Sequence, residues 1–239
     1  MEYVFHFEAV LNRNVLTFLL KGATNTIYLS FTTIITSIIL GIIVGIFRTF
    51  KDSTIENNNF KGRLVYVLQQ VCYWGATTYV EIVRGTPLLV QIFVIYFGLP
   101  SIGIDLPSWP AALLALTLNN GAYIADIVRS GIESIDKGQI EASRSLGLNY
   151  FKTMQYIVMP QAIKRIIPPL TSQFAALIKD TSLVSIIAIS ELTFSGQQVI
   201  ARTFRSFEVW IVVAFMYFAM TYTVSLISKY FERRGRQSE

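Results

Sequence analysis

The sequence predicts an all-α fold, a polytopic membrane helix bundle with five transmembrane helices, and three observations support this fold class. Charged residues make up only 15% of the 239 residues, against about 25% in soluble proteins. Hydrophobic residues reach 53% and the mean hydropathy is +0.50, which excludes a disordered chain. The apolar residues also gather into five long stretches, and the basic residues gather between some of these stretches and not others.

Each apolar stretch is long enough to cross a hydrocarbon core of about 30 Å at about 1.5 Å per helical residue. Residues 64–80 are a shorter apolar stretch with Gln69 and Gln70 inside it. We interpret them as an interfacial or tilted helix that leads into the second span, and we expect residues 1–239 to form one transmembrane domain. The predicted spans cover about residues 22–47, 64–104 with a break near 85–87, 109–128, 166–190 and 209–228.

The N-terminal residues 4–20 alternate apolar and polar positions at roughly helical spacing. Two interpretations stay open, a short helix lying on the membrane surface or an ordered tail packed on the bundle. Glu2 and Glu8 stand where a signal peptide would carry basic residues, so no cleavable signal is expected.

The basic residues predict the orientation of the spans. With five spans, 14 of the 20 Lys and Arg residues fall on the side of the C-terminus and four on the other side. Because basic residues collect on the cytoplasmic side, the N-terminus is expected outside and the C-terminus inside. If residues 64–80 made a full span, the opposite orientation would place 13 basic residues inside and six outside, so the five-span preference is modest. Topology explains the net charge of +5, and no nucleic-acid partner is expected.

Cys72 and His6 are the single cysteine and the single histidine of the sequence. An intrachain disulfide framework, a Cys-rich or His-rich metal site and a Ser-His-Asp triad are therefore excluded. No catalytic residue, no metal ligand and no cofactor is expected in this chain. An integral-membrane enzyme and a non-transporting scaffold or sensor are kept as alternative functions.

The polar segment 129–165 is too long for a plain loop and contains two predicted helices. Residues 139–146 form the first, with Gly147 as its C-terminal stop, and residues 150–158 form the second, ended by Pro160. The segment has too many apolar residues for a solvated loop. Two interpretations stay open. These apolar residues pack the helix pair against the ends of the spans, or they dock the first helix into a groove on a soluble partner.

Three motifs carry a resemblance to a known family. Glu141-Ala142-Ser143, Gly147 and Ile157-Val158-Met159-Pro160 resemble the EAA loop of bacterial ATP-binding-cassette importer permeases. The spacing agrees throughout, although Ser143 replaces an alanine and Met159 a leucine of the family pattern. Residues 81–89 (EIVRGTPLL) and 179–183 (KDTSL) are similar to the polar amino-acid permease subfamily.

The resemblance implies a type I importer permease fold in a bacterial inner (plasma) membrane and a polar amino acid as substrate. It implies a second permease copy or homologue, two copies of an ATPase subunit that bind ATP and Mg, and an external solute-binding protein. The chain has no phosphate loop of the Gly-x-x-x-x-Gly-Lys-Ser/Thr type, so we do not expect it to hydrolyse ATP. Residues 200–204 and 135–139 resemble cystine-type permeases, while glutamine and basic amino acids stay open. The expected ATPase-coupling residues are Glu141, Ala142, Ser143, Gly147 and Pro160.

Polar residues near the middle of predicted spans are candidates for the substrate pathway, because polar groups are costly there. Thr181 and Ser182 would cap a restarted helix whose N–H groups bind an anionic group, or Lys179 would pair with Asp180 or Glu191 in an internal ion pair. In the second span, Thr86 suits a helix N-cap, Pro87 suits the first helical position, and Glu81 is expected to pair with Arg84. The candidates are Asn119, Asn120, Tyr123, Gln91, Gln173, Lys179, Asp180, Thr181, Ser182 and Thr86.

Overall fold

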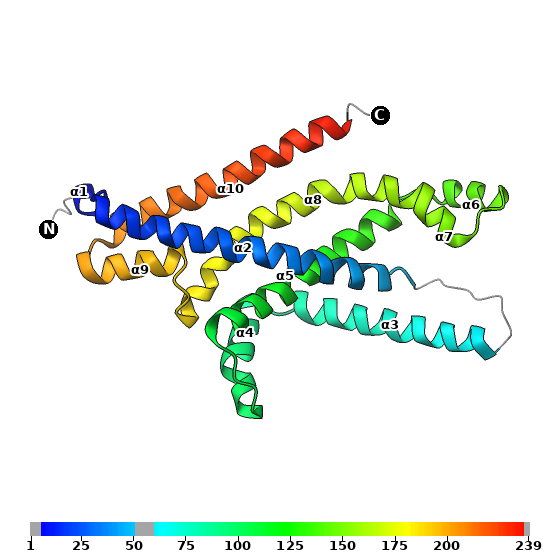
Figure 1. Cartoon of the computed structure of the whole chain (residues 1–239), viewed down its shortest axis with the longest axis horizontal. Coiled ribbons are helices and arrows are strands. Elements are labelled where there is room, and N and C mark those ends of the chain that lie inside the picture. The colour runs from blue at the N-terminus through cyan, green and yellow to red at the C-terminus, as the bar shows by residue number, and fades with distance from the viewer. Residues whose placement is uncertain (1–5, 51–59, 237–239) are drawn as a thin grey trace. The chain divides into compact units, whose positions relative to one another are not determined.

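A computed structural model describes residues 6–50 and 60–236 of the chain, and all its regular elements there are helical (Figure 1). The predicted all-α class is confirmed. The α-helices are α1 (Phe7–Val10), α2 (Arg13–Phe47), α3 (Phe60–Arg84), α4 (Leu88–Phe93), α5 (Ser108–Glu133), α6 (Lys137–Ser145), α7 (Tyr150–Thr153), α8 (Met159–Asp180), α9 (Leu192–Thr203) and α10 (Ser206–Arg236). The π-helices are η2 (Val94–Gly98) and η4 (Met154–Val158), and the 3₁₀ helices are η3 (Leu99–Ile102) and η5 (Thr181–Ile187).

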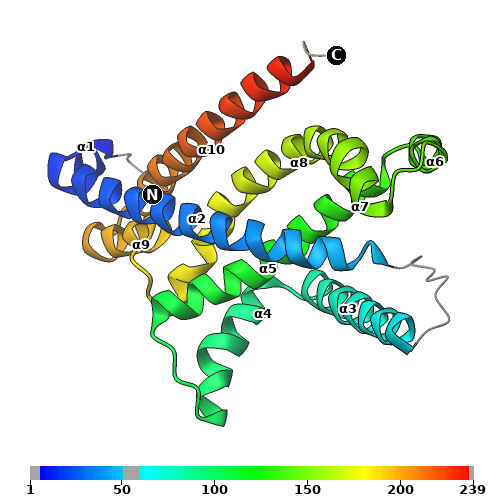
Figure 2. The same ribbon diagram turned by 45° about the vertical axis from the view of Figure 1, so that its right-hand side comes forward.

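The chain divides into two compact units that alternate along the sequence. Unit 1 comprises Met1–Ile35, Leu88–Thr117 and Phe174–Ile227, and unit 2 comprises Thr36–Pro87, Leu118–Gln173 and Ser228–Glu239. Figures 1 and 2 show α2, α5 and α8 as continuous helices. By their bounds, each begins in one unit and ends in the other.

Among the described residues, three helices are long and apolar enough to cross a membrane: α2, α5 and α10. Helices α3 and α4 together make a fourth candidate, broken between Arg84 and Leu88, where the sequence predicts a break. Helix α8 carries Lys164 and Arg165 near one end and Lys179 near the other, and it is not among these candidates. The count of five spans and their orientation stay predictions.

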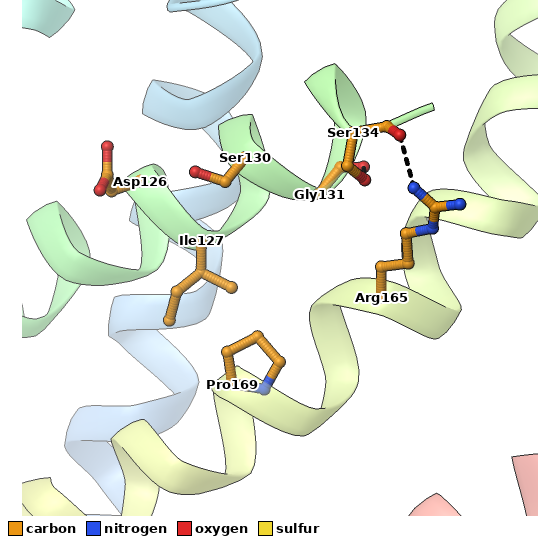
Figure 3. A pocket seen from close by; sticks show the side chains of 7 residues that line it. All are labelled: Asp126, Ile127, Ser130, Gly131, Ser134, Arg165 and Pro169. Carbon is orange, nitrogen blue, oxygen red and sulfur yellow. Dashed lines mark hydrogen bonds between the residues drawn. The ribbon is translucent and has the colours of Figure 1, made fainter. Parts of the chain in front are cut away.

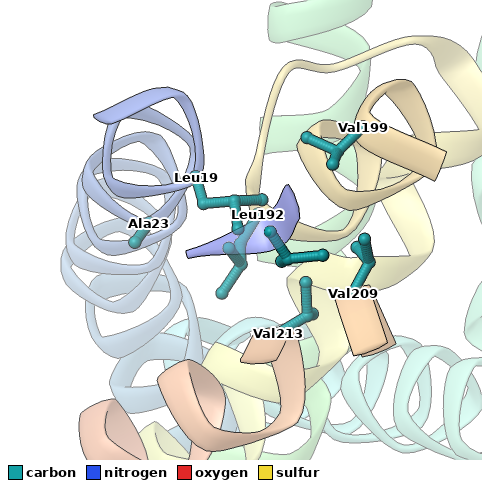
Figure 4. Close-up of a cluster of buried hydrophobic side chains, with 7 residues drawn as sticks. Leu19, Ala23, Leu192, Val199, Val209 and Val213 are labelled. Atoms are coloured by element: carbon teal, nitrogen blue, oxygen red, sulfur yellow. The ribbon is translucent and has the colours of Figure 1, made fainter. Parts of the chain in front are cut away.

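Unit 1 is held together by an apolar cluster in which α1, α2, α9 and α10 meet (Figure 4). Val10 and Leu19 are fully buried there, so the N-terminal residues pack on the bundle, and Arg13 already belongs to the long helix α2. Other helices cover these apolar side chains, as the interpretation of an ordered tail packed on the bundle predicts, and a position at the membrane surface stays a prediction. The buried members are Val10, Leu19, Ala23, Leu192, Val199, Val209 and Val213.

Unit 2 depends on close contact between α2 and α5. A Cβ atom at Gly41 would lie 2.4 Å from Ile124 Cγ2, and one at Gly45 would lie 2.8 Å from Val128 Cβ. Gly121 of α5 approaches the side chain of Leu40 in the same way. Small residues on both helices therefore allow their backbones to come together, as in membrane helix pairs with a small-xxx-small pattern.

The prediction that a helix ends at Pro160 is wrong. Helices α7, η4 and α8 follow one another without a gap from Tyr150 to Asp180, and Pro160 lies in the first turn of α8. Proline lacks the N–H that an α-helical turn uses, and the wider π-turn of Met154–Val158 just before it reshapes the hydrogen bonding at that point. We call this continuous helical segment, Tyr150–Asp180, the rod, and it also contains Pro168 and Pro169.

Candidate functional site

The segment predicted to couple to a partner begins with a helix that is capped at both ends. The Asp136 carboxylate accepts a hydrogen bond from the Gly138 N–H at the start of α6. At its end, Gly147 has φ of +84°, the Leu148 N–H donates to the Ser143 carbonyl (3.1 Å) and the Gly147 N–H to the Arg144 carbonyl (2.9 Å). This pair of bonds is a Schellman motif, so the glycine ends α6 in a single fixed geometry.

The second helix of the segment starts directly after this turn. Asn149 caps it, since its side-chain oxygen accepts a hydrogen bond from the Lys152 N–H at 2.9 Å. Capping residues thus stand before each helix, at Asp136 and Asn149. Tyr150 is 53% exposed, and the partial burial of its ring raises the pKa of the phenol, while the positive charge of Arg144 acts in the opposite direction.

Large apolar side chains are exposed around the turn between α6 and α7. Leu146 is 83% exposed and Phe151 is 73% exposed, and Tyr150 beside them is also exposed. Glu141 and Ala142 of the EAA-like motif are exposed on α6 as well. We call Glu141, Ala142, Leu146, Gly147 and Phe151 the turn surface.

The opposite side of α6 faces its own chain. Ser143 is only 3% exposed, and its hydroxyl lies 2.9 Å from the hydroxyl of Thr153 on α7. Four residues earlier, Gln139 accepts a hydrogen bond from the side chain of Gln161 on α8. In the EAA-like triplet, Glu141 and Ala142 are therefore exposed, while Ser143 is buried.

A cluster of charges joins α2, α3 and α5 within unit 2. The Asp126 carboxylate accepts one hydrogen bond from Arg48 (2.9 Å) and one from Arg84 (2.6 Å), and Arg48 also lies 3.7 Å from Glu81. The side chain of Arg48 is 3% exposed, and the Arg84 guanidinium stacks over the ring of Tyr123 at 5.2 Å. The expected Glu81–Arg84 pair is wrong, because Asp126 offers Arg84 a closer carboxylate from another helix.

Asn120 and Gln173 are the predicted pathway residues that the structure brings together. The Gln173 amide donates to the Asn120 side-chain oxygen at 2.8 Å, and Asn120 is fully buried. Asn119, one position earlier on α5, is 5% exposed. Nearby in unit 2, the Tyr79 hydroxyl donates to the Leu118 carbonyl. These contacts make a polar layer between α3, α5 and α8.

A cavity of about 350 Å³ lies between α5 and the first half of α8 (Figure 3). Arg165 at its rim donates to the Ser134 carbonyl. None of the ten predicted pathway residues lines this cavity, although Asp126 of the charge cluster does. The lining residues are Asp126, Ile127, Ser130, Gly131, Ser134, Arg165 and Pro169.

The predicted helix restart at Thr181 and Ser182 is wrong. The chain continues there as the 3₁₀ helix η5, and the Thr181 hydroxyl donates back to the Ile178 carbonyl. The restart comes at Glu191, whose carboxylate accepts hydrogen bonds from the Thr193 and Phe194 N–H groups at the start of α9. The N-terminus of α9 is therefore capped by a carboxylate of its own chain.

The expected ion pairs of Lys179 are not formed in the part of the chain that the structure describes. Lys179 is exposed, Asp180 is half-buried, and no salt bridge joins Lys179 to Asp180 or Glu191. Glu191 instead accepts a hydrogen bond from the Tyr217 hydroxyl at 2.6 Å.

The remaining candidates lie around the break in the second predicted span. Gln91 is half-buried on α4. The Thr86 hydroxyl donates to the Ile82 carbonyl at 2.9 Å, so Thr86 lies at the end of α3 and does not cap the next helix. Helix α4 begins at Leu88, one position after Pro87.

In residues 6–50 and 60–236, no three His, Cys, Asp or Glu side chains gather in a way that could hold a metal ion.

Comparison with known proteins identifies the family to which this chain belongs. Residues 62–237 match the family described as binding-protein-dependent transport system inner membrane component. The chain belongs to this family. The family includes ATP-binding-cassette importer permeases, and the resemblance found in the sequence motifs is confirmed. The chain has the fold of type I importer permeases.

Three similar proteins illustrate the match. The chain is 41% identical over 222 residues to the probable glutamine ABC transporter permease protein GlnP of Bacillus subtilis, covering 92% of this chain and 94% of that protein. It is 41% identical over 162 residues to the L-cystine transport system permease protein TcyB of the same organism, covering 67% and 69%. A crystal structure of an amino acid ABC transporter with histidines superposes with a TM-score of 0.85 at 34% identity, covering 97% of this chain and 100% of that one.

Sequence reasoning missed two groups of residues. It did not anticipate the salt bridge between Arg48 and Asp126, which lie on different helices. It also missed the role of Glu191 as a helix cap with Tyr217. A charged residue at the end of an apolar stretch is a signal for such a cluster, but its partner comes from another helix and cannot be read from local spacing.

Proposed function

We propose that this chain is the membrane-spanning permease subunit of an ATP-driven importer for a polar amino acid in a bacterial plasma membrane. It crosses the membrane five times with its N-terminus outside and its C-terminus inside. An external solute-binding protein delivers the substrate, a second permease copy or homologue completes the pathway, and two copies of a separate ATPase subunit bind ATP and Mg. Closure of the ATPase switches the pathway from outward to inward access.

The turn surface carries this proposal. Leu146 and Phe151 lie outside the predicted spans, so their 83% and 73% exposure places large apolar side chains in water. Exposed apolar groups gathered beside polar ones mark protein interaction sites. The capped helix α6 and the turn at Gly147 hold them in fixed positions, as a surface that docks into a cleft on a cytoplasmic ATPase requires.

The charge cluster supports the proposed topology. Arg48 and Asp126 stand at or near the ends of the first and third predicted spans, and Arg84 stands just before the break in the second, after the stretch 64–80 that we interpret as interfacial or tilted. The structure joins all three by salt bridges. With five spans these three points all lie on one side of the membrane, as the salt bridges require, and the distribution of the basic residues assigns that side to the cytoplasm.

The polar layer supports an amino-acid substrate. The paired amides of Asn120 and Gln173 place polar groups within the third and fourth predicted spans, where polar side chains mark transport pathways. The sequence resemblance favours cystine as the substrate, while the similar protein GlnP is named as a probable glutamine permease. We propose a polar amino acid of this group, and uptake of labelled cystine and glutamine by cells that express the whole system tells the two apart.

The docking role is tested by co-purification with the cognate ATPase subunit. Gly147→Asp adds a charge to the turn surface and a side chain at a positive φ, and we expect it to abolish co-purification. Gly103→Asp is a matched control, because Gly103 has φ of +86° and, like Gly147, has nothing within 4 Å of a built Cβ. It lies at the outer end of the second predicted span in the proposed topology and should leave co-purification unchanged. An unchanged pull-down with Gly147→Asp would overturn the proposed function.

A further inference from the structure

Two polar contacts join α6 to the helical rod of α7, η4 and α8 on the side away from the turn surface. The first is the pair of hydroxyls of Ser143 and Thr153, which are 3% and 2% exposed and 2.9 Å apart. Ser143 donates its one hydrogen to the Ile140 carbonyl at 2.7 Å. Thr153 is therefore the donor in the pair, and both hydroxyl groups are satisfied without water.

The second contact joins Gln139 to Gln161. The Gln161 NH₂ group donates to the Gln139 side-chain oxygen at 2.5 Å and to the Ile157 carbonyl at 2.9 Å. Both of its hydrogens are used, so the carboxamide has one orientation. The bond ties the first turn of α6 to the first turn of α8.

The two contacts lie on one face of α6. Gln139 and Ser143 are four residues apart, and residues at this spacing stand one above the other on a helix. Glu141 and Ala142 point to other sides and are exposed. The helix therefore has one face that holds it to the rod and another that is open to a partner.

The two contacts, together with the short turn between α6 and α7, fix α6 to this rod. Residues 150–180 are helical without a gap, so Thr153 and Gln161 belong to the same rod as Lys179 and Asp180 at the end of α8. A helix pair joined at two points one turn apart resists rotation as well as sliding, whereas one point leaves a pivot.

We propose that docking and transmission are carried by different residues of this segment. The turn surface binds the ATPase, and the Ser143–Thr153 and Gln139–Gln161 contacts pass its movement to α8 as positioning residues for transport. The inference rests on the proposed function and deepens it. It separates two phenotypes, loss of binding and loss of coupling, that a single docking element would lose together.

The test uses the complete transporter in liposomes, with the binding protein and substrate, and measures transport, ATP hydrolysis and co-purification. Ser143→Ala and Thr153→Val should keep the ATPase bound and hydrolysing, while substrate transported per ATP falls about tenfold, the factor that one buried hydrogen bond of about 1.4 kcal/mol represents. Thr153→Ser keeps the hydroxyl and should keep the coupling. Ser145→Ala is the matched control, because the Ser145 hydroxyl donates only to the Glu141 carbonyl of its own helix.

A purely structural role predicts a different pattern. Replacing both hydroxyls in Ser143→Ala/Thr153→Val leaves no unpaired donor, so thermal stability should return while the coupling stays low. Recovery of coupling together with stability would show that the pair only stabilises the fold and would overturn the inference. Gln139→Ala, at an exposed position, gives a second reading should the buried variants fail to fold.

Two further outcomes also decide the matter. Normal transport per ATP in Ser143→Ala, Thr153→Val and Gln139→Ala would overturn the inference and leave the proposed function intact. Loss of ATPase binding in these variants would show that docking and transmission share one set of residues. Failure of the proposed function has its own signature, an ATPase that stays bound to Gly147→Asp.

Discussion

Substitution of Gly41 by alanine tests the close packing of α2 on α5. The new Cβ would lie 2.4 Å from Ile124 Cγ2 and 3.1 Å from the Ala125 backbone nitrogen, and backbone cannot move aside as a flexible side chain can. Overpacking of this kind costs about 1–3 kcal/mol. Replacing a mid-helix glycine by alanine gains about 1 kcal/mol in helix propensity, so the net loss is smaller than the steric cost.

The matched variant is Gly75→Ala in the interior of α3, where a Cβ meets nothing within 4 Å. Both variants have the same gain in propensity, so their difference isolates the steric cost of about 1–3 kcal/mol. For a chain of this size each kcal/mol shifts the melting temperature by about 2–4 °C. Thermal unfolding of the detergent-purified protein should place Gly41→Ala below Gly75→Ala. Equal melting temperatures would refute the close approach of the two helices.

Two other substitutions test buried polar contacts by the same unfolding assay. Asp126→Asn leaves the buried arginine of the charge cluster without its nearest carboxylate and should cost about 3 kcal/mol, at the low end for a buried charge because Asp126 is a third exposed. Glu133→Gln breaks only the exposed pair with Arg129 and should cost less than about 1 kcal/mol; equal losses would contradict the burial argument. Tyr217→Phe removes a hydrogen bond to the buried Glu191 and should cost about 1.5–3 kcal/mol. The exposed Tyr222→Phe should change stability by less than about 0.5 kcal/mol, and an equal effect of the two would show that the Glu191 contact contributes nothing.

The polar segment 129–165 shows how much of the structure could be predicted from local sequence. Residues 139–146 were predicted helical and the structure has α6 at Lys137–Ser145, with Gly147 in the left-handed conformation at its end. Glycine at a helix end and polar residues at helix starts act within a few residues, so sequence alone is sufficient to place them. Whether the apolar residues packed inward or faced a partner stayed open, and the structure shows Ser143 buried and Leu146 exposed.

The polar residues inside the apolar stretches show where such reasoning fails. Thr181 and Ser182 look like helix caps in sequence, but a cap is needed only where the chain turns, and it turns after Ala188, which has φ of 58°. Glu191 then serves as the cap. Its carboxylate also accepts a hydrogen bond from Tyr217, 26 residues later, which no local pattern reveals.

The sequence by itself determined the class of the molecule. The scarcity of charge and the lengths of the apolar stretches reflect the cost of charge in a membrane, and the spacing of the EAA-like motif is a local property of the chain. Tertiary structure decided the pairing: Asp126 with Arg48 and Arg84, Asn120 with Gln173, Ser143 with Thr153. The first two sets of contacts join helices far apart in sequence, and the third joins neighbouring helices across a turn. In each, a buried polar group takes whichever partner the packing brings within hydrogen-bonding distance.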